Sequence, residues 1–285
     1  MNIFKSGEPI DLSEHMLATY QTLRVVLVIV ALAFPWVLGI GGRFVFDDIP
    51  LQASMSDYYH ASHKSIAKRD DDRKAGKVDP DNSGLGVMRN WFVGVLFAIS
   101  GLLVVYKGFR PAEDLALNLA GLFAVLIALV PNTWEGHGPP WHGIFAVSFF
   151  LCISYVSIFA ASATLPLVKP ERRKHFRRIY KALGWAMVLT PLIAAVLSFF
   201  PGFSGRFIFL AEFFGVYAFA FYWLVKTLEI RQTNADRRAA SGELLLAAGK
   251  GASDALRELP VIGADQEPLF SVGTLADTVR SDAGV

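Results

Sequence analysis

The sequence predicts an all-α fold, a polytopic membrane helix bundle with six transmembrane helices. Three observations predict this fold class. The 285 residues have a mean hydropathy of +0.42, and 53% of them are hydrophobic. Only 18% are charged, whereas soluble chains average about 25%. The apolar residues also gather in six continuous blocks, each close to the length of about 20 residues that crosses a bilayer. The blocks do not alternate between apolar and polar residues, which argues against a transmembrane barrel.

The six predicted spans follow one another in blocks of similar length. They cover residues 25–42, 91–106, 115–130, 143–168, 183–200 and 207–225. The first block starts too far into the chain for a cleaved signal peptide, and no small-x-small cleavage site follows it. Tryptophan and tyrosine residues mark span borders, where such rings prefer the headgroup level. Glycine and proline residues inside the spans predict close contacts between helices or kinks: Gly94, Gly101, Gly121, Gly184 and Pro191.

The composition divides the chain into three regions. Residues 1–24 form a predicted N-terminal segment, and residues 25–230 form the six-helix domain with an exterior loop at 44–90. Within that loop, Asp47-Asp48-Ile49-Pro50 predicts the start of a short helix that ends near Ala67, and residues 68–84 have the polar composition of a linker. Residues 231–285 form a polar tail with one predicted helix at 235–259. We expect this tail to be loosely ordered, and a docking arm for a protein partner is the alternative.

The basic residues predict the orientation in the membrane. With the distal tail left aside, 15 Lys and Arg residues fall on the side of both termini and nine on the other side. Cytoplasmic segments carry the excess of basic residues. We therefore expect a multi-pass protein of the inner (cytoplasmic) membrane, with its N- and C-termini in the cytoplasm.

Several functional classes receive no support from the composition or motifs. The net charge of +2 lacks the basic excess of a nucleic-acid-binding protein. The single cysteine, Cys152, excludes an intrachain disulfide and a cysteine-rich metal cluster. No phosphate-binding loop, dinucleotide fingerprint or Gly-x-Ser-x-Gly motif occurs in the sequence.

Four of the six histidines fall in the two loops assigned to the exterior: His60, His63, His137 and His142. The most informative run is Ser54-Met-Ser-Asp-Tyr-Tyr-His60. If this run is α-helical, Ser56 and His60 are neighbours at i and i+4. A metal-bound or base-acting histidine commonly needs such a hydroxyl or carboxylate partner to orient its ring. The alternative is an interfacial amphipathic helix whose Tyr and His side chains lie at the headgroups.

Glu212 lies inside the sixth span, near the same predicted side as these histidines. An acid within a span is costly and indicates a functional site. We therefore predict a zinc site with His60, His142 and Glu212 as ligands. Its catalytic groups would be Ser56, Asp57 and Glu212, which would orient or activate a water molecule. The structural alternative pairs Glu212 with Arg206 or a tyrosine and leaves His142 as an interface residue.

Other polar residues near the spans have ordinary interpretations. Asn118 is expected to form an interhelical hydrogen bond, and Glu113 and Asp114 suit a helix N-terminus. Lys226 and Glu229 are interpreted as charges at the border of the last span. The basic run at 169–181 would attract anionic lipid, but its first expected role is to set the topology.

Several runs of residues resemble a known group of membrane proteins. Besides the run from Ser54 to His60, they are Arg-Asn-Trp-Phe-Val-Gly at 89–94, Tyr-Lys-Gly at 106–108, Asn-Leu-Ala-Gly at 118–121 and Tyr-Trp-Leu-Val-Lys at 222–226. Together they resemble a family of uncharacterised bacterial proteins with six transmembrane helices. The resemblance covers residues 20–230 and implies architecture, not activity.

A fainter similarity reaches the alkaline ceramidase and adipoQ-receptor superfamily of membrane hydrolases. Those proteins hold zinc with Ser-x-x-x-His, an aspartate and His-x-x-x-His, and they hydrolyse lipid amides. Ser56 and His60 match the first element, and the only aspartates for the second are those at 70–72. His137 and His142 are five residues apart rather than four, and this chain has six spans rather than seven.

Two functions are expected from these observations. The first is an inner-membrane protein with a zinc site at the outer end of the bundle that hydrolyses a lipid-like substrate. The second is a non-catalytic membrane component, either an accessory subunit or a small transporter. Membrane lipid is the expected partner in both cases, and a protein partner would bind the exterior loop or the tail.

Overall fold

A computed structural model of the chain describes residues 12–45, 49, 51–59, 87–130, 141–198 and 206–240. Every regular element in these ranges is a helix, and they contain no strand, so the all-α prediction is confirmed. Six of the helices are long and apolar enough to cross a membrane. These two findings together support the predicted multi-pass membrane architecture.

The long helices are continuous α-helices or α-helices extended by π or 3₁₀ turns. They are α1 (Leu12–Trp36) with the π-helix η1 (Val37–Val45), α3 (Val87–Val105), α4 (Pro111–Leu129), α5 (Trp141–Tyr155) with η5 (Val156–Ala160) and η6 (Ala161–Leu167), α6 (Pro170–Ser198) and α7 (Arg206–Thr233). Two short helices complete the described fold: the 3₁₀ helix η2 (Ser56–Tyr59) and α8 (Ala235–Ala240).

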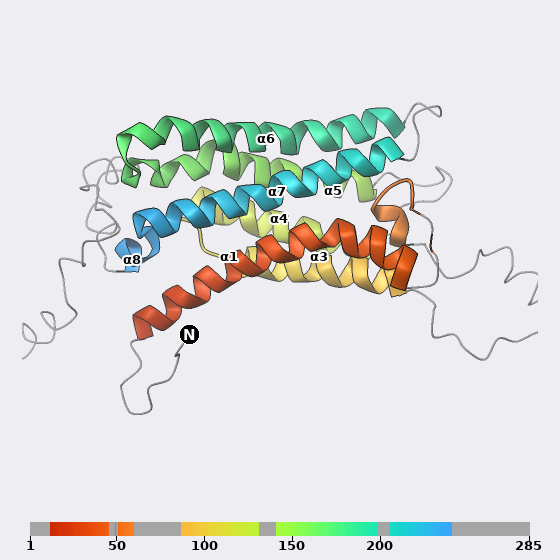
Figure 1. Ribbon diagram of the computed structural model, residues 1–285, viewed down its shortest axis with the longest axis horizontal. Helices are drawn as coiled ribbons and strands as arrows, with labels where there is room; N and C mark the ends of the chain where they lie inside the picture. Colours follow the sequence, from red (N-terminus) through yellow and green to blue (C-terminus); the bar gives the residue numbers. More distant parts are fainter. Residues whose placement is uncertain are drawn as a thin grey trace, which may run out of the picture.

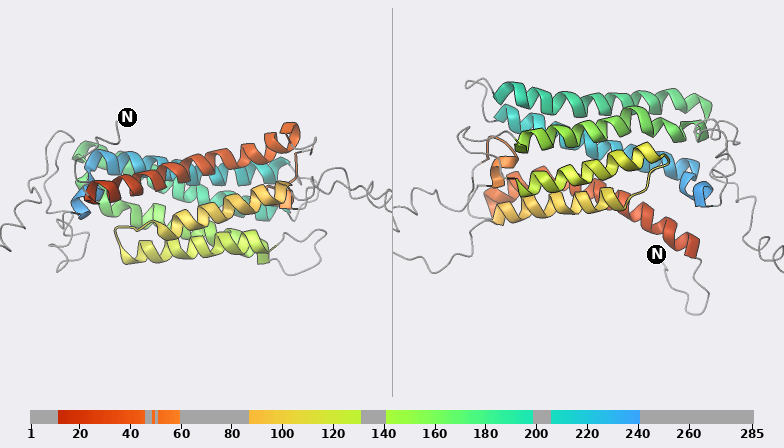
Figure 2. Two further views of the ribbon diagram at one scale, coloured as in Figure 1. Left: turned by 90° about the horizontal axis from the view of Figure 1, so that it is seen from below. Right: turned by 180° about the vertical axis from the view of Figure 1, so that it is seen from behind.

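The six long helices run side by side, as Figures 1 and 2 show. Each one packs against the next in the chain, and α7 packs back against α1, so that the helices form a closed ring. The bundle therefore has two ends. We call the end that carries α8 and the first turns of α1 the α8 end, and the opposite end, with residues 49–59, the η2 end (Figure 1).

Several helices extend beyond the predicted spans. The first span covers Glu14–Phe44 and the last covers Phe207–Thr233, whereas the sequence predicted 25–42 and 207–225. A helix of 29 residues such as α6 is about 43 Å long at 1.5 Å per residue, and the hydrocarbon core is about 30 Å thick. Hydropathy detects only the part of a helix that lies in hydrocarbon, so the polar turns at the ends were missed.

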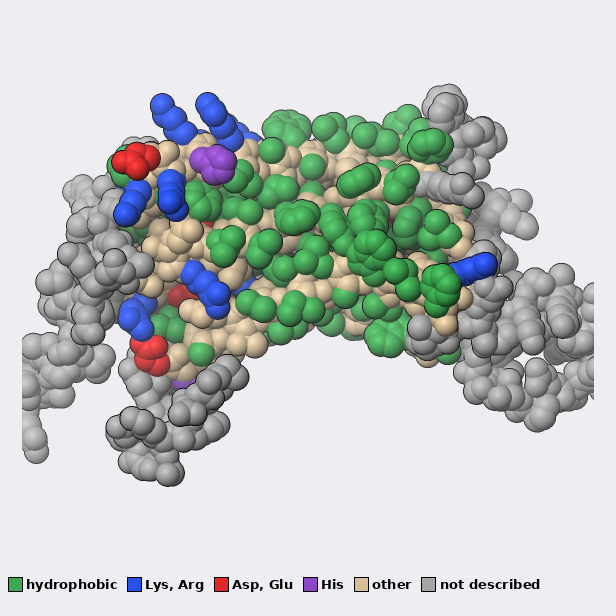
Figure 3. Space-filling view, viewed as in Figure 1, with side chains coloured by type: hydrophobic (Ala, Val, Ile, Leu, Met, Phe, Trp, Pro, Cys, Tyr) green, Lys and Arg blue, Asp and Glu red, His purple; other side chains and the backbone are tan. Residues whose placement is uncertain are grey.

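Two of the four glycines named from the sequence, Gly121 and Gly184, allow helices to approach closely, whereas a Cβ atom on Gly94 or Gly101 would have no neighbour within 4 Å. A Cβ atom on Gly121 would lie 2.6 Å from Val104 on α3, and one on Gly184 would lie 2.4 Å from Ile158 on η5. Large apolar side chains are exposed around the middle of the bundle (Figure 3). In a membrane this exposed band would contact lipid, because apolar surface of this extent is rare on soluble proteins.

Residues 51–59 pack across the η2 end against α3. The sequence predicted an α-helix from about residue 48 to Ala67, and the described part of that range contains the 3₁₀ helix η2 instead. The predicted linker at 68–84 lies outside the described residues. Of the predicted tail helix at 235–259, the first six residues form α8, and the rest lies outside the described residues.

Candidate functional site

Glu212, on the second turn of α7, binds the segment that caps the η2 end. One carboxylate oxygen accepts a hydrogen bond from the Ser54 hydroxyl at 2.9 Å, and the other accepts one from the backbone N–H of Met55 at 2.5 Å. The Ser54 hydroxyl in turn lies 2.7 Å from that of Ser56. The Asp57 carboxylate interacts electrostatically with Glu212. The structure thus brings together the three predicted catalytic residues, Ser56, Asp57 and Glu212, at one end of the bundle.

The local sequence explains how this segment turns. The Ser54 hydroxyl accepts a hydrogen bond from the N–H of Ser56 at 3.0 Å, which is a serine turn of the kind that competes with regular helix. The N–H of Asp57 and that of Tyr58 then bond to the carbonyls three residues earlier. In a 3₁₀ helix, residues i and i+3 share a face, so Ser56 aligns with Tyr59. Residues 56–59 therefore have 3₁₀ rather than α-helical spacing, and His60 lies outside the described residues.

Tyr58 anchors the segment in the bundle. Its side chain is fully buried, and a Cβ atom on Gly42 would lie only 3.2 Å from its ring. Burial raises the pKa of Tyr58 above its ordinary value. Tyr58 is therefore a neutral packing residue at physiological pH, whereas the neighbouring Ser54 and Ser56 form a polar cluster with Glu212.

His142, the second residue of α5, lies at the same end. Its Nδ1 donates a hydrogen bond to the carbonyl of Val130 at 2.7 Å. The imidazole stacks on the ring of Phe92, with 6.4 Å between centroids, and Tyr59 contacts Phe92 edge-on at 6.5 Å. His142 is therefore connected through one aromatic ring to the residue that precedes His60.

The predicted zinc ligands are only partly described. His60, His63 and His137 lie outside the described residues. Among the residues that are described, no three His, Cys, Asp or Glu side chains gather closely enough to hold a metal ion. The zinc site with His60, His142 and Glu212 stays a prediction. The described contacts of Glu212 and His142 each join two parts of the bundle.

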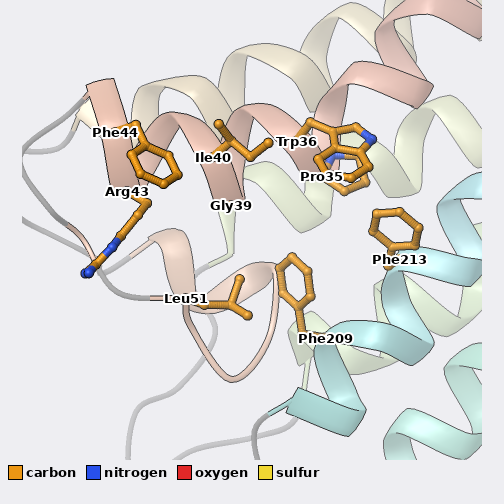
Figure 4. Close-up of a pocket in the computed structure, with 9 residues that line it drawn as sticks. All are labelled: Pro35, Trp36, Gly39, Ile40, Arg43, Phe44, Leu51, Phe209 and Phe213. Carbon is orange, nitrogen blue, oxygen red and sulfur yellow. The ribbon is translucent and has the colours of Figure 1, made fainter.

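A groove opens at the η2 end, between the end of α1–η1 and the start of α7 (Figure 4). Its volume is about 430 Å³. It is lined by Pro35, Trp36, Gly39, Ile40, Arg43, Phe44, Leu51, Phe209 and Phe213. Apart from Gly39 and Arg43, these side chains are all apolar. Phe209 and Phe213 flank Glu212 in the sequence, so the groove and the carboxylate share one stretch of α7.

The two ends of the groove differ. Trp36 and Phe213 form one end with their rings in edge-to-face contact at 5.9 Å, and the indole N–H of Trp36 donates to the Tyr217 hydroxyl at 2.5 Å. Arg43 and Phe44 lie at the other end, and the guanidinium of Arg43 points away from the apolar lining (Figure 4). Trp36, Ile40 and Phe44 are all exposed, so the groove opens on the outer surface of the bundle.

A second polar cluster lies at the α8 end, and the sequence interpretation missed it. Lys226 and Glu229 are fully buried and form a salt bridge of 3.0 Å. The Lys226 ammonium also donates to the Thr164 hydroxyl at 2.6 Å and to the carbonyl of Ala161 at 3.3 Å. Glu229 accepts further hydrogen bonds from Thr164 and from the Tyr180 hydroxyl. The interpretation of Lys226 and Glu229 as border charges is therefore wrong.

More charged residues are buried around this pair. Arg24 is fully buried, donates to Asp236 on α8 and lies over the Tyr106 ring, with its guanidinium carbon 5.8 Å from the centroid. Glu113 is buried on the first turn of α4 and accepts a hydrogen bond from the N–H of Phe109 at 3.0 Å. Burial, with a further contribution from Glu113, raises the pKa of Tyr106. The cluster ties six elements of the α8 end together.

Comparisons with known proteins found no match to this chain. No protein-family model matches the sequence, and no curated protein and no solved structure matches it. The resemblances to a bacterial six-span family and to the ceramidase superfamily thus stay predictions. The assignment that stands is a helical bundle with six helices able to span a membrane.

Proposed function

We propose that this protein binds a lipid-like amphiphile at the η2 end. The apolar part of the ligand would occupy the groove between α1–η1 and α7. The polar part would lie toward Arg43 and the segment that Glu212 holds. The observation that carries the proposal is the groove itself, because an apolar lining that opens on the exposed surface of a spanning bundle is accessible to lipid from the side.

The size and chemistry of the groove support such a ligand. Its volume of about 430 Å³ lies within the range of about 300–1,000 Å³ that is usual for small-ligand pockets. Apolar contact alone gives little selectivity in a bilayer, because the competing lipid tails are equally apolar. Selectivity must therefore come from shape, which the Trp36–Phe213 contact holds, and from polar groups at the Arg43 end.

Photocrosslinking can test this proposal. The protein would be reconstituted in vesicles that contain a phospholipid with a diazirine in its acyl chain, illuminated and digested. We expect labelling of residues 36–44 and 209–213 in excess of the exposed α4 surface formed by Leu115, Leu119 and Leu122. The α4 surface is the control, because it is also apolar and exposed but contributes no residue to the lining of the groove. Equal labelling of the two surfaces would refute the proposal.

A zinc-dependent, lipid-directed hydrolase is the second candidate. Two contacts favour it: Glu212 binds the segment that leads to His60, and Phe92 touches both Tyr59 and His142. In this scheme His60 and His142 would be ligands, and Glu212 would be a ligand or general base. Ser56 and Asp57 would orient the reacting groups. Zinc would supply Lewis-acid activation of water and of a carbonyl.

Elemental analysis separates the two candidates. One zinc ion per chain in the purified protein, lost in the His60→Ala/His142→Ala double variant, would support the hydrolase. A full complement of zinc in that double variant would refute it. If the purified protein contains no zinc but is still labelled in the groove, the result would favour lipid binding without hydrolysis. That outcome would suit an accessory subunit.

The distribution of charge supports an orientation with the α8 end in the cytoplasm. Among the described residues, the exposed basic side chains at the α8 end are Lys107, Lys169, Arg172, Lys174, Arg177, Arg178, Lys181, Arg231 and Arg237, whereas those at the η2 end are Arg43 and Arg89. Basic residues favour the cytoplasmic side. A C-terminal reporter that is active only in the cytoplasm should therefore be active, and an active periplasmic reporter would contradict this orientation.

A further inference from the structure

The first turns of α6 present four basic side chains on one face. Lys174, Arg177, Arg178 and Lys181 are all exposed, and their spacing of i, i+3, i+4 and i+7 places them in a single stripe along the helix. The buried side chains of these turns, Phe176 and Tyr180, lie on another face. We call the four residues the basic stripe.

The same face of α6 continues as an exposed apolar surface. Trp185, Leu189, Leu192 and Val196 follow Lys181 at steps of three or four residues, and each is about half exposed. The basic stripe and the apolar side chains thus lie in one line along the helix. Figure 3 shows basic side chains over the first part of α6 and apolar ones over the rest.

This alignment places the basic stripe over lipid rather than over open solvent. If α6 spans a membrane, the exposed apolar part of this face lies against lipid acyl chains. Trp185 lies one turn beyond Lys181, and tryptophan prefers the boundary between hydrocarbon and headgroups. The stripe extends over about 10 Å of helix, and long basic side chains direct their charges toward the headgroup layer.

The charged residues near the stripe leave its positive charge largely uncompensated. Arg173 donates to the carbonyls of Pro166 and Val168, so it caps the end of η6 instead of facing lipid. Glu171 lies three residues before Lys174, on the first turn, and is the one acid of residues 170–181. His175 is exposed beside the stripe. The face therefore carries a clear excess of positive charge.

We propose that the basic stripe binds the phosphate groups of anionic phospholipids in the adjacent leaflet. Clusters of four or more basic residues next to a spanning segment attract anionic headgroups. The positive-inside rule requires basic residues on one side of the membrane, but it does not require them on the lipid-facing side of one helix. The site is separate from the groove, which lies at the opposite end of the bundle.

Spin-labelled lipids can test this inference. The full chain would be reconstituted in phosphatidylcholine vesicles with a trace of spin-labelled phosphatidylglycerol or phosphatidylcholine, and the protein-bound fraction measured. We expect wild-type protein to prefer phosphatidylglycerol by roughly threefold or more, and added salt to weaken this preference. The Arg178→Gln/Lys181→Gln variant should lose most of the preference.

The matched control is Lys169→Gln/Arg172→Gln. It removes the same charge from exposed residues at the start of α6 that lie off the stripe, and it should keep the preference. Equal binding of the two lipids by wild-type protein would overturn the inference, even if a variant fails to fold. Equal losses in the two variants would also overturn it. Suppression by soluble glycerol phosphate would show that free phosphate, and not lipid, is the ligand.

Discussion

The two ends of the bundle bury carboxylates in opposite ways. At the α8 end, Glu229 binds Lys226, Thr164 and Tyr180, and the three protons of the ammonium have three acceptors. At the η2 end, Glu212 binds two donors of one short segment and lies on α7 between Phe209 and Phe213, which line an open groove. The first arrangement is closed, and the second leaves room for a ligand.

The difference shows that a charge within a span does not by itself identify a binding site. An intramembrane ionisable residue suggests function, but a salt bridge whose hydrogen bonds are all made inside the protein has no group left for a ligand. The Lys226–Glu229 pair therefore holds η6, α6 and α7 together, whereas Glu212 holds only Ser54 and Met55 of the segment at the η2 end. The variants below test this contrast, from the largest expected effect to the smallest.

Removing one partner of the closed pair should have the largest effect. Lys226→Met leaves Glu229 buried without its counter-charge. Breaking a buried ion pair in this way lowers the free energy of unfolding by about 3–5 kcal/mol. We expect a large fall in the thermal stability of the detergent-solubilised protein. The Lys226→Met/Glu229→Gln variant should regain much of it, because neither charge is left alone. Arg231→Gln, an exposed change on the same helix, is the control. A Lys226→Met protein as stable as this control would contradict the closed-cluster account.

Adding one methyl group should destabilise the protein more at the α8 end than in the groove at the η2 end. A Cβ atom on Gly108, at the α8 end, would lie 2.5 Å from Cγ of Glu113, whereas one on Gly39, in the groove, would have its nearest neighbour at 3.6 Å. We expect Gly108→Ala to lower the free energy of unfolding by about 1–3 kcal/mol. Gly39→Ala should change it by less than about 0.5 kcal/mol. Similar losses in both variants would remove the contrast between the ends.

Neutralising Glu212 should have a smaller effect than the loss of Lys226. The amide of Glu212→Gln has a single acceptor oxygen. When that oxygen accepts from Ser54, the amide nitrogen faces the Met55 N–H, which then lacks its acceptor. We expect a loss of about 1–2 kcal/mol and faster hydrogen exchange at the Met55 amide, measured by mass spectrometry. Ser54→Ala, which removes one of the two donors, is the companion variant. Unchanged exchange at Met55 in Glu212→Gln would show that this carboxylate does not hold the segment.

Much of the fold could be predicted from the sequence, because continuous apolar blocks identify the part of each helix that lies in hydrocarbon. The ends could not be predicted in the same way. Residues 12–24 are mixed in polarity yet continue α1, and the burial of Arg24 at the end of this stretch involves its salt bridge with Asp236 on α8. Only the folded bundle brings those two residues, more than 200 positions apart, together.

The candidate site was found only in part. Glu212 stood out because an acid interrupts an apolar block, and the run at 54–57 stood out because its polar residues are dense. Lys226 and Glu229 did not stand out, since their burial depends on contacts with residues of η6 and α6 that are more than 45 positions away in the sequence. The groove has no sequence signal, because its walls come from α1 and α7.

Filling the groove tests the central claim most directly. Gly39→Leu places a side chain between Leu51 and Phe209, which lie 3.6 Å and 3.9 Å from the new Cβ, and so occupies the space proposed for the ligand. Gly94→Leu adds the same side chain to an exposed position with no neighbour within 4 Å. The measurement is acyl-chain photocrosslinking to residues 36–44 and 209–213. We expect labelling in Gly39→Leu to fall to the level of the α4 surface, while Gly94→Leu labels like wild type. Undiminished labelling in a folded Gly39→Leu protein would contradict lipid binding in the groove.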